Sequence, residues 1–211
     1  PCLLRKQLPG VDLILGRNRV RAAQIAEGEE YDLLILDDGF QHLPLARTLD
    51  TVLWNGDTKN RRLLPAGPFR EPASGIRRAS GAFSESGDAP EKKTFGFSRE
   101  YVGLRPICGK EIVPVSFLNG KSVNAACAIA RPQAFLGALR DFGAVISRTE
   151  LLPDHSEFDA VNWSNDAPWI VTAKDAVKLG GNEAEIYVLE MRVQFCDEEE
   201  VRRWLETKLF H

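Results

Sequence analysis

The sequence has no long apolar run and no initiating Met. None of its stretches approaches the roughly 18 consecutive apolar residues that a membrane-spanning helix needs, so no such helix is expected among the 211 residues. Residues 1–6 (Pro-Cys-Leu-Leu-Arg-Lys) contain no apolar segment of the kind that a secretory signal requires. Because the first residue is Pro1, we expect the chain to begin in the middle of a longer protein.

Cysteine and histidine are scarce as well. The four cysteines form no Cys-x-x-Cys pair, and none of the three histidines stands at zinc-ligand spacing from a cysteine. A zinc site is therefore not expected, and reduced thiols of a cytosolic protein are the simplest interpretation. Cys127 lies in the apolar run 123–130 and is predicted to be a small core residue.

Composition and charge exclude further classes. With 44% apolar and 27% charged residues, the chain is an ordinary globular protein and not a disordered one. Its net charge of -3 shows no excess of positive charge, so no nucleic acid partner is expected. Basic residues do gather between 59 and 78 against one acid, Glu71; they are Lys59, Arg61, Arg62, Arg70, Arg77 and Arg78. Such a patch suits phosphate groups or an anionic membrane surface, and a solvated loop is the alternative.

The first part of the chain has the pattern of a parallel α/β unit. Residues 11–16 predict a short strand, 17–29 a helix and 31–36 a second strand. The second strand is largely apolar without alternation, which is typical of a central parallel strand that is buried on both faces. A third strand is predicted at 51–54. The segment 55–80 is rich in Gly, Pro and Arg, and an irregular loop of that length is uncommon unless it is functional.

The second part predicts another α/β unit after a hairpin. Extended segments at 94–104 and 111–117, separated by a turn, predict two antiparallel strands. Beyond them the periodicity predicts strands at 122–130, 144–148, 169–172 and 187–191, and helices at 133–142 and 198–209. We therefore expect two α/β units that are joined by a β hairpin.

The sharpest local feature follows the predicted strand 31–36. Asp37 and Asp38 stand at its carboxyl end, where open parallel sheets bind ligands. An apolar strand that ends in Asp is typical of a Walker B element, whose carboxylate holds Mg²⁺ beside the phosphates of a nucleotide. Successive side chains alternate, so one carboxylate is expected to face the metal and the other to orient the loop. Asp-Asp-Gly is also ordinary turn chemistry, but the polar residues Gln41 and His42 that follow favour a site.

Two further segments carry candidate residues. Three prolines and a glycine stiffen the loop 63–72, which would hold Arg70 in place for bidentate phosphate recognition. The alternative is a surface loop in which Arg70 pairs with a neighbouring acid. His155 directly follows Asp154, and the combination is typical of a dyad or proton relay, with a surface turn as the alternative.

One partial motif match does not predict a phosphate-binding site. Gly120-Lys121-Ser122 matches the end of a phosphate-binding P-loop, but the full motif needs a glycine five positions earlier, where Val115 stands. The motif also requires a helix after it, and here a strand is predicted. The chain thus has a Walker-B-like strand without a P-loop.

Two long blocks and four short ones follow one another in an order that one family shares. The long blocks are Asp-Asp-Gly-Phe-Gln-His at 37–42 with Leu-Ala-Arg at 45–47, and Arg-Leu-Leu-Pro-Ala-Gly-Pro-Phe-Arg-Glu-Pro at 62–72. The short ones lie at 16–19, 129–132, 153–155 and 172–177. In these blocks, which span almost the whole chain, the sequence resembles the tetraacyldisaccharide 4′-kinases, the kinases of lipid A biosynthesis.

The resemblance implies a reaction, cofactors and partners. The family transfers the γ-phosphate of ATP, with Mg²⁺, to the 4′-hydroxyl of a lipid A disaccharide 1-phosphate precursor. This implies a peripheral location at the cytoplasmic face of the bacterial inner membrane and contact with its anionic surface. It also implies a P-loop NTPase-like core, here incomplete, in residues 1–90, a two-stranded linker in 91–117 and a smaller α/β domain in 118–211.

The resemblance also implies roles for single residues. Asp37 and Asp38 are expected to hold the metal, with Asp38 and Arg70 acting in catalysis near the phosphates. His155 is expected to partner a catalytic Asp in a dyad that activates the sugar hydroxyl. The residues expected to contact ATP are Asp37, Gln41, His42, Arg17 and Arg19.

The family's P-loop, membrane-associating helix and catalytic Asp precede the segment that matches here. We therefore expect a fragment that is inactive alone and needs the missing N-terminal part of the same protein. Ser156 and Ala128 depart from the family's pattern, which more often has His or Tyr at the first position and Gly at the second. The alternative function is a non-catalytic lipid- or partner-binding module derived from the kinase, which a start codon close to that of Pro1 would favour.

Overall fold

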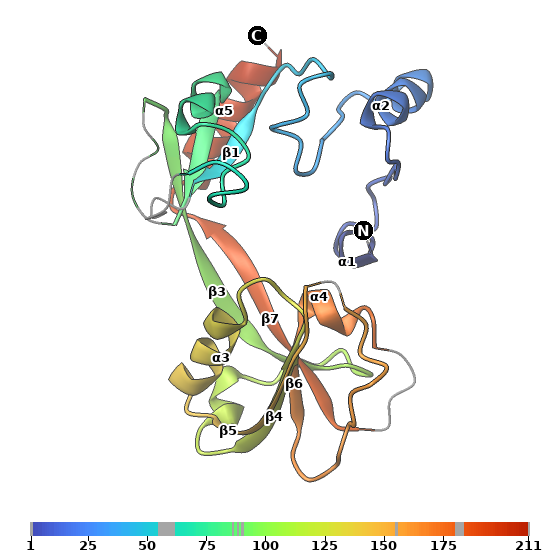
Figure 1. The fold of residues 1–211 in the computed structure, drawn as a ribbon, viewed down its shortest axis with the longest axis vertical. Helices are drawn as coiled ribbons and strands as arrows, with labels where there is room; N and C mark the ends of the chain where they lie inside the picture. Colours follow the sequence, from blue (N-terminus) through green and yellow to red (C-terminus); the bar gives the residue numbers. More distant parts are fainter. Residues whose placement is uncertain are drawn as a thin grey trace. The chain divides into compact units, whose positions relative to one another are not determined.

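The computed structural model describes residues 2–54, 62–85, 87, 89, 91–154, 156–179 and 184–210. The chain divides into two compact units (Figure 1). One consists of Pro1–Val11 and Glu100–Arg192, and we call it the 100–192 unit. The other consists of Asp12–Arg99 and Val193–His211, and we call it the 12–99 unit. The chain thus leaves the 12–99 unit and returns to it at its end.

The strands form one sheet in the order β1-β2-β3-β7-β6-β4-β5. Their bounds are β1 Thr51–Trp54, β2 Gly81–Ser84, β3 Thr94–Pro106, β4 Ser122–Cys127, β5 Val145–Leu151, β6 Trp169–Thr172 and β7 Ile186–Phe195. β1, β2 and β3 pair in parallel, and so do β5, β4, β6 and β7. This arrangement confirms the predicted α/β class and its parallel pairing.

Aromatic packing holds the 12–99 unit together on one face of its strands. Phe83 and Phe95 are neighbours in the β2–β3 register, and their ring centroids lie 6.4 and 4.8 Å from that of Trp204. Trp204 belongs to α5 (Glu198–Phe210), which therefore covers this face. A Cβ on Gly81 would lie 2.7 Å from the Trp204 ring, so glycine lets the helix approach the sheet.

The other face of these strands carries a small apolar cluster. Ala82 is fully buried there, and the ring of Phe40 packs against the cluster from the loop that precedes β1. The short helix η1 (Ala73–Arg78) contributes Ile76. The cluster is therefore what attaches the two predicted phosphate-binding segments, around 40 and around 70, to the strands.

The predicted first helix is confirmed as α2 (Arg19–Gly28). Its N-cap is Asn18, whose side chain accepts a hydrogen bond from Arg21 N at 3.0 Å. Capping of this kind satisfies one of the backbone N–H groups that a helix leaves unpaired at its start. A shorter helix, α1 (Cys2–Gln7), precedes it in the chain.

The 100–192 unit has a better developed core. β4 is buried from its second residue to its last, and α3 (Pro132–Asp141) covers one face of it with Phe135 and Leu139. Pro132 occupies the first turn of α3, directly before the predicted helix 133–142, because its missing N–H has no partner to lose there. Cys127 is fully buried, which confirms its prediction as a core residue. Two further described helices of this unit are η2 (Val115–Leu118) and α4 (Ala173–Ala176).

The prediction of strands at 11–16 and 31–36 is wrong for this structure. Both segments are irregular, and the side chains of Leu33, Leu34 and Ile35 are 52%, 50% and 86% exposed. A strand needs a neighbour for its N–H and C=O groups. Within the described part of the chain no strand pairs with either segment, and the edge strand β1 pairs with β2 alone. An apolar run indicates that a segment suits burial, but it does not provide the neighbouring strand with which the segment would pair.

The predicted hairpin also differs in detail. Leu104 and Val113 form an isolated antiparallel bridge, so the chain does turn back, but the residues after the bridge form η2 instead of a strand. The long partner of β3 is β7, from much later in the chain. Among the described helices, none combines the length and apolar character needed to cross a membrane.

Candidate functional site

The Asp-Asp-Gly segment forms a turn in the 12–99 unit. Asp37 and Asp38 both have exposed side chains, and Asp38 has a φ of +48°, in the left-handed region that Asp tolerates better than most residues. Gly39 is buried, and a Cβ there would clash with the side chain of Leu36. Tight packing beneath the turn therefore directs both carboxylates toward solvent.

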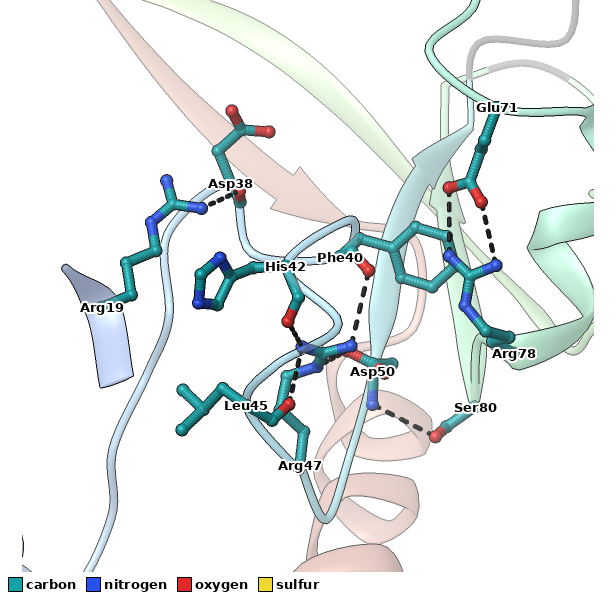
Figure 2. A network of polar contacts seen from close by, with 10 residues as sticks. All are labelled: Arg19, Asp38, Phe40, His42, Leu45, Arg47, Asp50, Glu71, Arg78 and Ser80. Carbon is teal, nitrogen blue, oxygen red and sulfur yellow. Dashed lines mark hydrogen bonds and ion pairs between the residues drawn. The ribbon is translucent and has the colours of Figure 1, made fainter. Parts of the chain in front are cut away.

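Two arginines approach Asp38. Arg19, the first residue of α2, donates from Nη1 to the backbone oxygen of Asp38 at 3.0 Å (Figure 2). Arg70 Nη1 lies 3.8 Å from Asp38 Oδ2, and the two side chains are 66% and 78% exposed. Exposed ion pairs contribute about 0–1 kcal/mol, so a ligand with more charge can replace this one at small cost. The turn thus combines carboxylates with guanidinium groups in an open position.

Arg47 fixes the loop that follows the turn. Its Nη1 donates to the backbone oxygens of His42 at 2.5 Å and Leu45 at 2.9 Å, and its Nη2 donates to Phe40 O at 3.4 Å. Its Nε donates to Asp50 Oδ1 at 2.6 Å (Figure 2). The side chain is 14% exposed, so these bonds are largely shielded from water. One guanidinium therefore sets the path of the backbone between residues 40 and 50.

A second guanidinium connects this loop to the loop around residue 70. Arg78 binds Glu71 through two nitrogens, at 2.8 and 3.1 Å, and its Cζ lies 4.8 Å from the centre of the Phe40 ring. Gln41 Nε2 donates to the same Glu71 carboxylate at 3.2 Å. The hydrogen bond from Arg78 lowers the pKa of Glu71, Gln41 adds to this effect, and partial burial opposes it. The same pair raises the pKa of Arg78, so both groups are charged at neutral pH.

The segment before Arg70 closes on itself. Leu64 N donates to Phe69 O at 2.8 Å, and Phe69 N donates to Arg62 O at 3.2 Å. Gly67 lies against the Arg62 carbonyl, where any Cβ would collide with the backbone. The loop is therefore a compact unit that presents Arg70 at its end.

The donor set at the turn fits Mg²⁺. In the part of the chain that the structure describes, no three His, Cys, Asp or Glu side chains form a group that could hold a metal. Mg²⁺ is usually bound through one or two carboxylates, with water and substrate phosphates completing its shell. Asp37 and Asp38 provide two adjacent exposed carboxylates of this kind.

Comparison with known proteins decides the family. A family model described as Tetraacyldisaccharide-1-P 4'-kinase matches residues 1–210. The chain belongs to the tetraacyldisaccharide 4′-kinase family. It is 35% identical to a Tetraacyldisaccharide 4'-kinase of Anaeromyxobacter sp. (strain K) over 96% of this chain and 61% of that protein. It is 33% identical to one of Delftia acidovorans over 92% of this chain and 59% of that protein.

A solved member of the tetraacyldisaccharide 4′-kinase family has the same fold. It is a crystal structure of LpxK from Aquifex aeolicus in complex with ATP, with a TM-score of 0.73 and 27% identity. The match covers 90% of this chain and 62% of that chain. The chain therefore spans about three fifths of the length of the kinases that it matches.

The structure brings together part of the predicted site. Asp37, Asp38, Arg19 and Arg70 lie at or beside one turn, and Gln41 joins the neighbouring network through Glu71. The backbone of His42 closes the turn by donating to Gly39 O at 2.9 Å, and among the described residues its buried Nε2 has no hydrogen-bond partner. Arg17 is exposed just before α2. His155 lies outside the described residues. The functional roles of all these residues stay predictions.

Two structural residues of the site were not identified from the sequence as part of it. Arg47 and Arg78 hold the loops that carry the predicted residues. Arg47 belongs to the Leu-Ala-Arg block at 45–47, but hydrogen bonds to backbone oxygens cannot be inferred from the spacing of residues in the sequence. Arg78 was counted with the basic patch, and only the fold shows that it binds Glu71.

Proposed function

We propose that this chain takes part in the ATP-dependent phosphorylation of the 4′-hydroxyl of a lipid A disaccharide 1-phosphate. The observation that carries the proposal is the turn at Asp37 and Asp38, with Arg19 and Arg70 beside it. Membership of the kinase family and the likeness to a relative solved with ATP support it. An open group of carboxylates and guanidiniums suits the phosphates of a nucleotide, because phosphoryl transfer needs mainly positioned charge.

In this proposal the residues at and around the turn have different roles. Asp37 and Asp38 hold Mg²⁺, which neutralises phosphate charge when it is bound. Arg70 exchanges its weak ion pair with Asp38 for the phosphates of ATP, with bidentate geometry available. Arg17, Arg19, Gln41 and His42 contact the nucleotide; the buried Nε2 of His42 is the group whose hydrogen bonding a ligand would complete. Arg47 and Arg78 keep these groups in place.

The transfer itself needs a base. The sugar 4′-oxygen forms a bond to the γ-phosphorus, the bond from that phosphorus to the bridging oxygen breaks, and the hydroxyl proton passes to the base. We assign the base to an Asp in a preceding part of the protein, with His155 as its partner in a dyad. Proton transfer by a positioned pair of this kind contributes about 10²–10⁴-fold to a rate.

The exposed apolar segment 31–36 supports a preceding part of the same protein. Leu33, Leu34 and Ile35 would suit a strand buried between neighbours, and such neighbours would come from that part together with the P-loop. In this proposal residues 1–90 complete a P-loop core, 91–117 contain the linker, and 118–211 form the smaller domain up to Arg192 and then return to the core through α5. The complete protein acts at the cytoplasmic face of the inner membrane, in contact with its anionic surface.

The experiment compares this chain with a longer one. The 211-residue chain, and the same chain extended by the reading frame that precedes Pro1, are assayed for transfer of radioactive phosphate from ATP to a lipid A disaccharide 1-phosphate. We expect transfer by the longer protein and none by the 211 residues. Transfer by the chain alone would refute its dependence on a preceding part, and no transfer by a longer protein that contains a P-loop would favour the non-catalytic module.

A further inference from the structure

The loop that leads to Arg70 carries an uncharged tip. Residues 63–68 are Leu-Leu-Pro-Ala-Gly-Pro, and we call them the apolar tip. Apart from Gly67, which is partly buried, all of them are exposed, and Leu63 and Leu64 are 42% and 61% exposed. Single exposed apolar residues are common on protein surfaces, but a continuous exposed apolar stretch indicates contact with an apolar partner.

The backbone of the loop satisfies most of its own hydrogen bonds. Three N–H groups donate to backbone oxygens of the same loop, those of Leu64, Gly67 and Phe69. Pro65 and Pro68 have no N–H group. Five of the six positions from 64 to 69 therefore have no N–H that needs water. Unsatisfied backbone groups are what makes an irregular loop costly in a lipid environment, so this tip can enter one at small cost.

The charges around the apolar tip favour one kind of partner. Between residues 62 and 70 the chain has two arginines, Arg62 and Arg70, and no acid. The carboxylate of the next residue, Glu71, is neutralised by Arg78 at 2.8 and 3.1 Å. An apolar tip alone would suit a protein partner equally well. Flanking positive charges together with apolar side chains are typical of segments that lie in the interface of an anionic bilayer.

We propose that the apolar tip enters the headgroup region of an anionic lipid bilayer, with Leu63 and Leu64 as its main contacts. The proposal deepens the proposed function and rests on it for the nature of the acceptor, a lipid held in the membrane. Arg70 follows the tip by two residues and lies beside Asp38. Contact of the tip with the bilayer would thus bring the Asp37–Asp38 turn to the surface at which a lipid presents its sugar hydroxyl.

The test measures binding of the longer protein to vesicles of phosphatidylethanolamine and phosphatidylglycerol, without acceptor lipid, by cosedimentation. We expect the double variant Leu63→Gln/Leu64→Gln to bind about 10–50-fold more weakly than the wild type, because two half-exposed leucines no longer leave water. The control is Val145→Gln, which changes a residue of the 100–192 unit that is 58% exposed, and it should bind like the wild type. Wild-type affinity in the double variant would overturn the proposal.

Other occupants of the apolar tip give different results. If a preceding part of the protein covers the leucines, the double variant should lose thermal stability and keep its affinity for vesicles, which would overturn the proposal. A loss of affinity confined to vesicles that contain the acceptor would indicate contact with an acyl chain of the acceptor and would also overturn it. Should the double variant fail to fold, Leu64→Trp decides. Tryptophan favours the membrane interface, so this variant should bind at least as tightly as the wild type, and weaker binding would refute the contact.

The vesicle measurement is independent of phosphate transfer because it contains no ATP. Failure of the longer protein to transfer phosphate, with the expected loss of vesicle affinity in the double variant, would refute the proposed function and support the membrane contact. Transfer by the wild type together with unchanged vesicle affinity in the double variant would support the proposed function and overturn the membrane contact.

Discussion

The guanidinium of Arg78 binds the carboxylate of Glu71 through two nitrogens, Nη1 at 2.8 Å and Nη2 at 3.1 Å. The pair joins the loop that ends in Arg70 to η1, and the Arg78 side chain also lies over the ring of Phe40. Because the ring belongs to the loop after the Asp-Asp turn, one side chain connects both predicted phosphate-binding segments. The connection is electrostatic and therefore depends on pH.

Removing the charge of Glu71 should reduce the acid sensitivity of the protein. The pKa of Glu71 is lowered in the folded state by Arg78, so its stabilisation is complete above the ordinary value of 4.5 and is lost as the pH falls through the lower, folded value. The Glu71→Gln variant should lose about 0.5–1 kcal/mol at pH 7 and little at pH 3, because the pair is partly exposed. Urea unfolding at both pH values measures this. Equal losses of unfolding free energy at pH 7 and pH 3 would contradict this prediction. The control is Glu91→Gln, which removes a carboxylate from an exposed ion pair with Arg77.

Arg47 should matter more for stability than any exposed arginine. In Arg47→Ala, three backbone oxygens and Asp50 lose a shielded donor, which should lower the free energy of unfolding by about 2 kcal/mol or more. In Arg47→Lys, the lysine side chain has no planar guanidinium group and should recover only part of the lost free energy of unfolding. Urea unfolding gives the values, with Arg99→Ala, from an exposed pair with Glu85, expected to change by less than about 0.5 kcal/mol. A loss as small as that of the control would show that Arg47 does not fix the loop.

Cys127 should resist thiol reagents. Burial, with a contribution from the charge of Asp175, raises its pKa to about 11, so at pH 8 about one thiol in a thousand is ionised. The other cysteines, Cys2, Cys108 and Cys196, are exposed. Labelling with iodoacetamide at pH 8 should therefore modify these three quickly and Cys127 only after unfolding, as read by mass spectrometry of peptides. Rapid labelling of Cys127 in the folded protein would contradict its place in the core.

Particular residues show what the sequence could reveal. The helices α2 and α3 were expected from the sequence because helical periodicity is a local pattern, but the cap that Asn18 provides for α2 was not. The apolar run of β4 was rightly expected to be buried. The similar run at 31–36 was not buried, because burial depends on neighbouring strands that a local pattern cannot provide. The C-terminal helix was predicted, but not its contact with β2 and β3 through Trp204, since that contact joins residues far apart in the chain.

The candidate site shows the same division. Asp37, Asp38 and Arg70 were singled out by local chemistry, and the alternatives of a turn and of an ion pair with an acid are both seen in the structure. Neither excludes the predicted site, because the turn leaves the carboxylates exposed and the pair is weak. The supporting bonds of Arg47 and Arg78 could not be predicted, because they join a side chain to backbone or to a distant loop.

The central claim is that the Asp37–Asp38 turn serves phosphate transfer, and Asp38→Asn tests it most directly. Asparagine keeps the size of the side chain and tolerates the left-handed backbone at this position, so the turn should persist while its charge is lost. In the extended, active protein we expect transfer of phosphate from ATP to fall about 100–1,000-fold, with unchanged thermal stability and no effect of the control Asp141→Asn. Turnover of Asp38→Asn within about threefold of the wild type would contradict the claim.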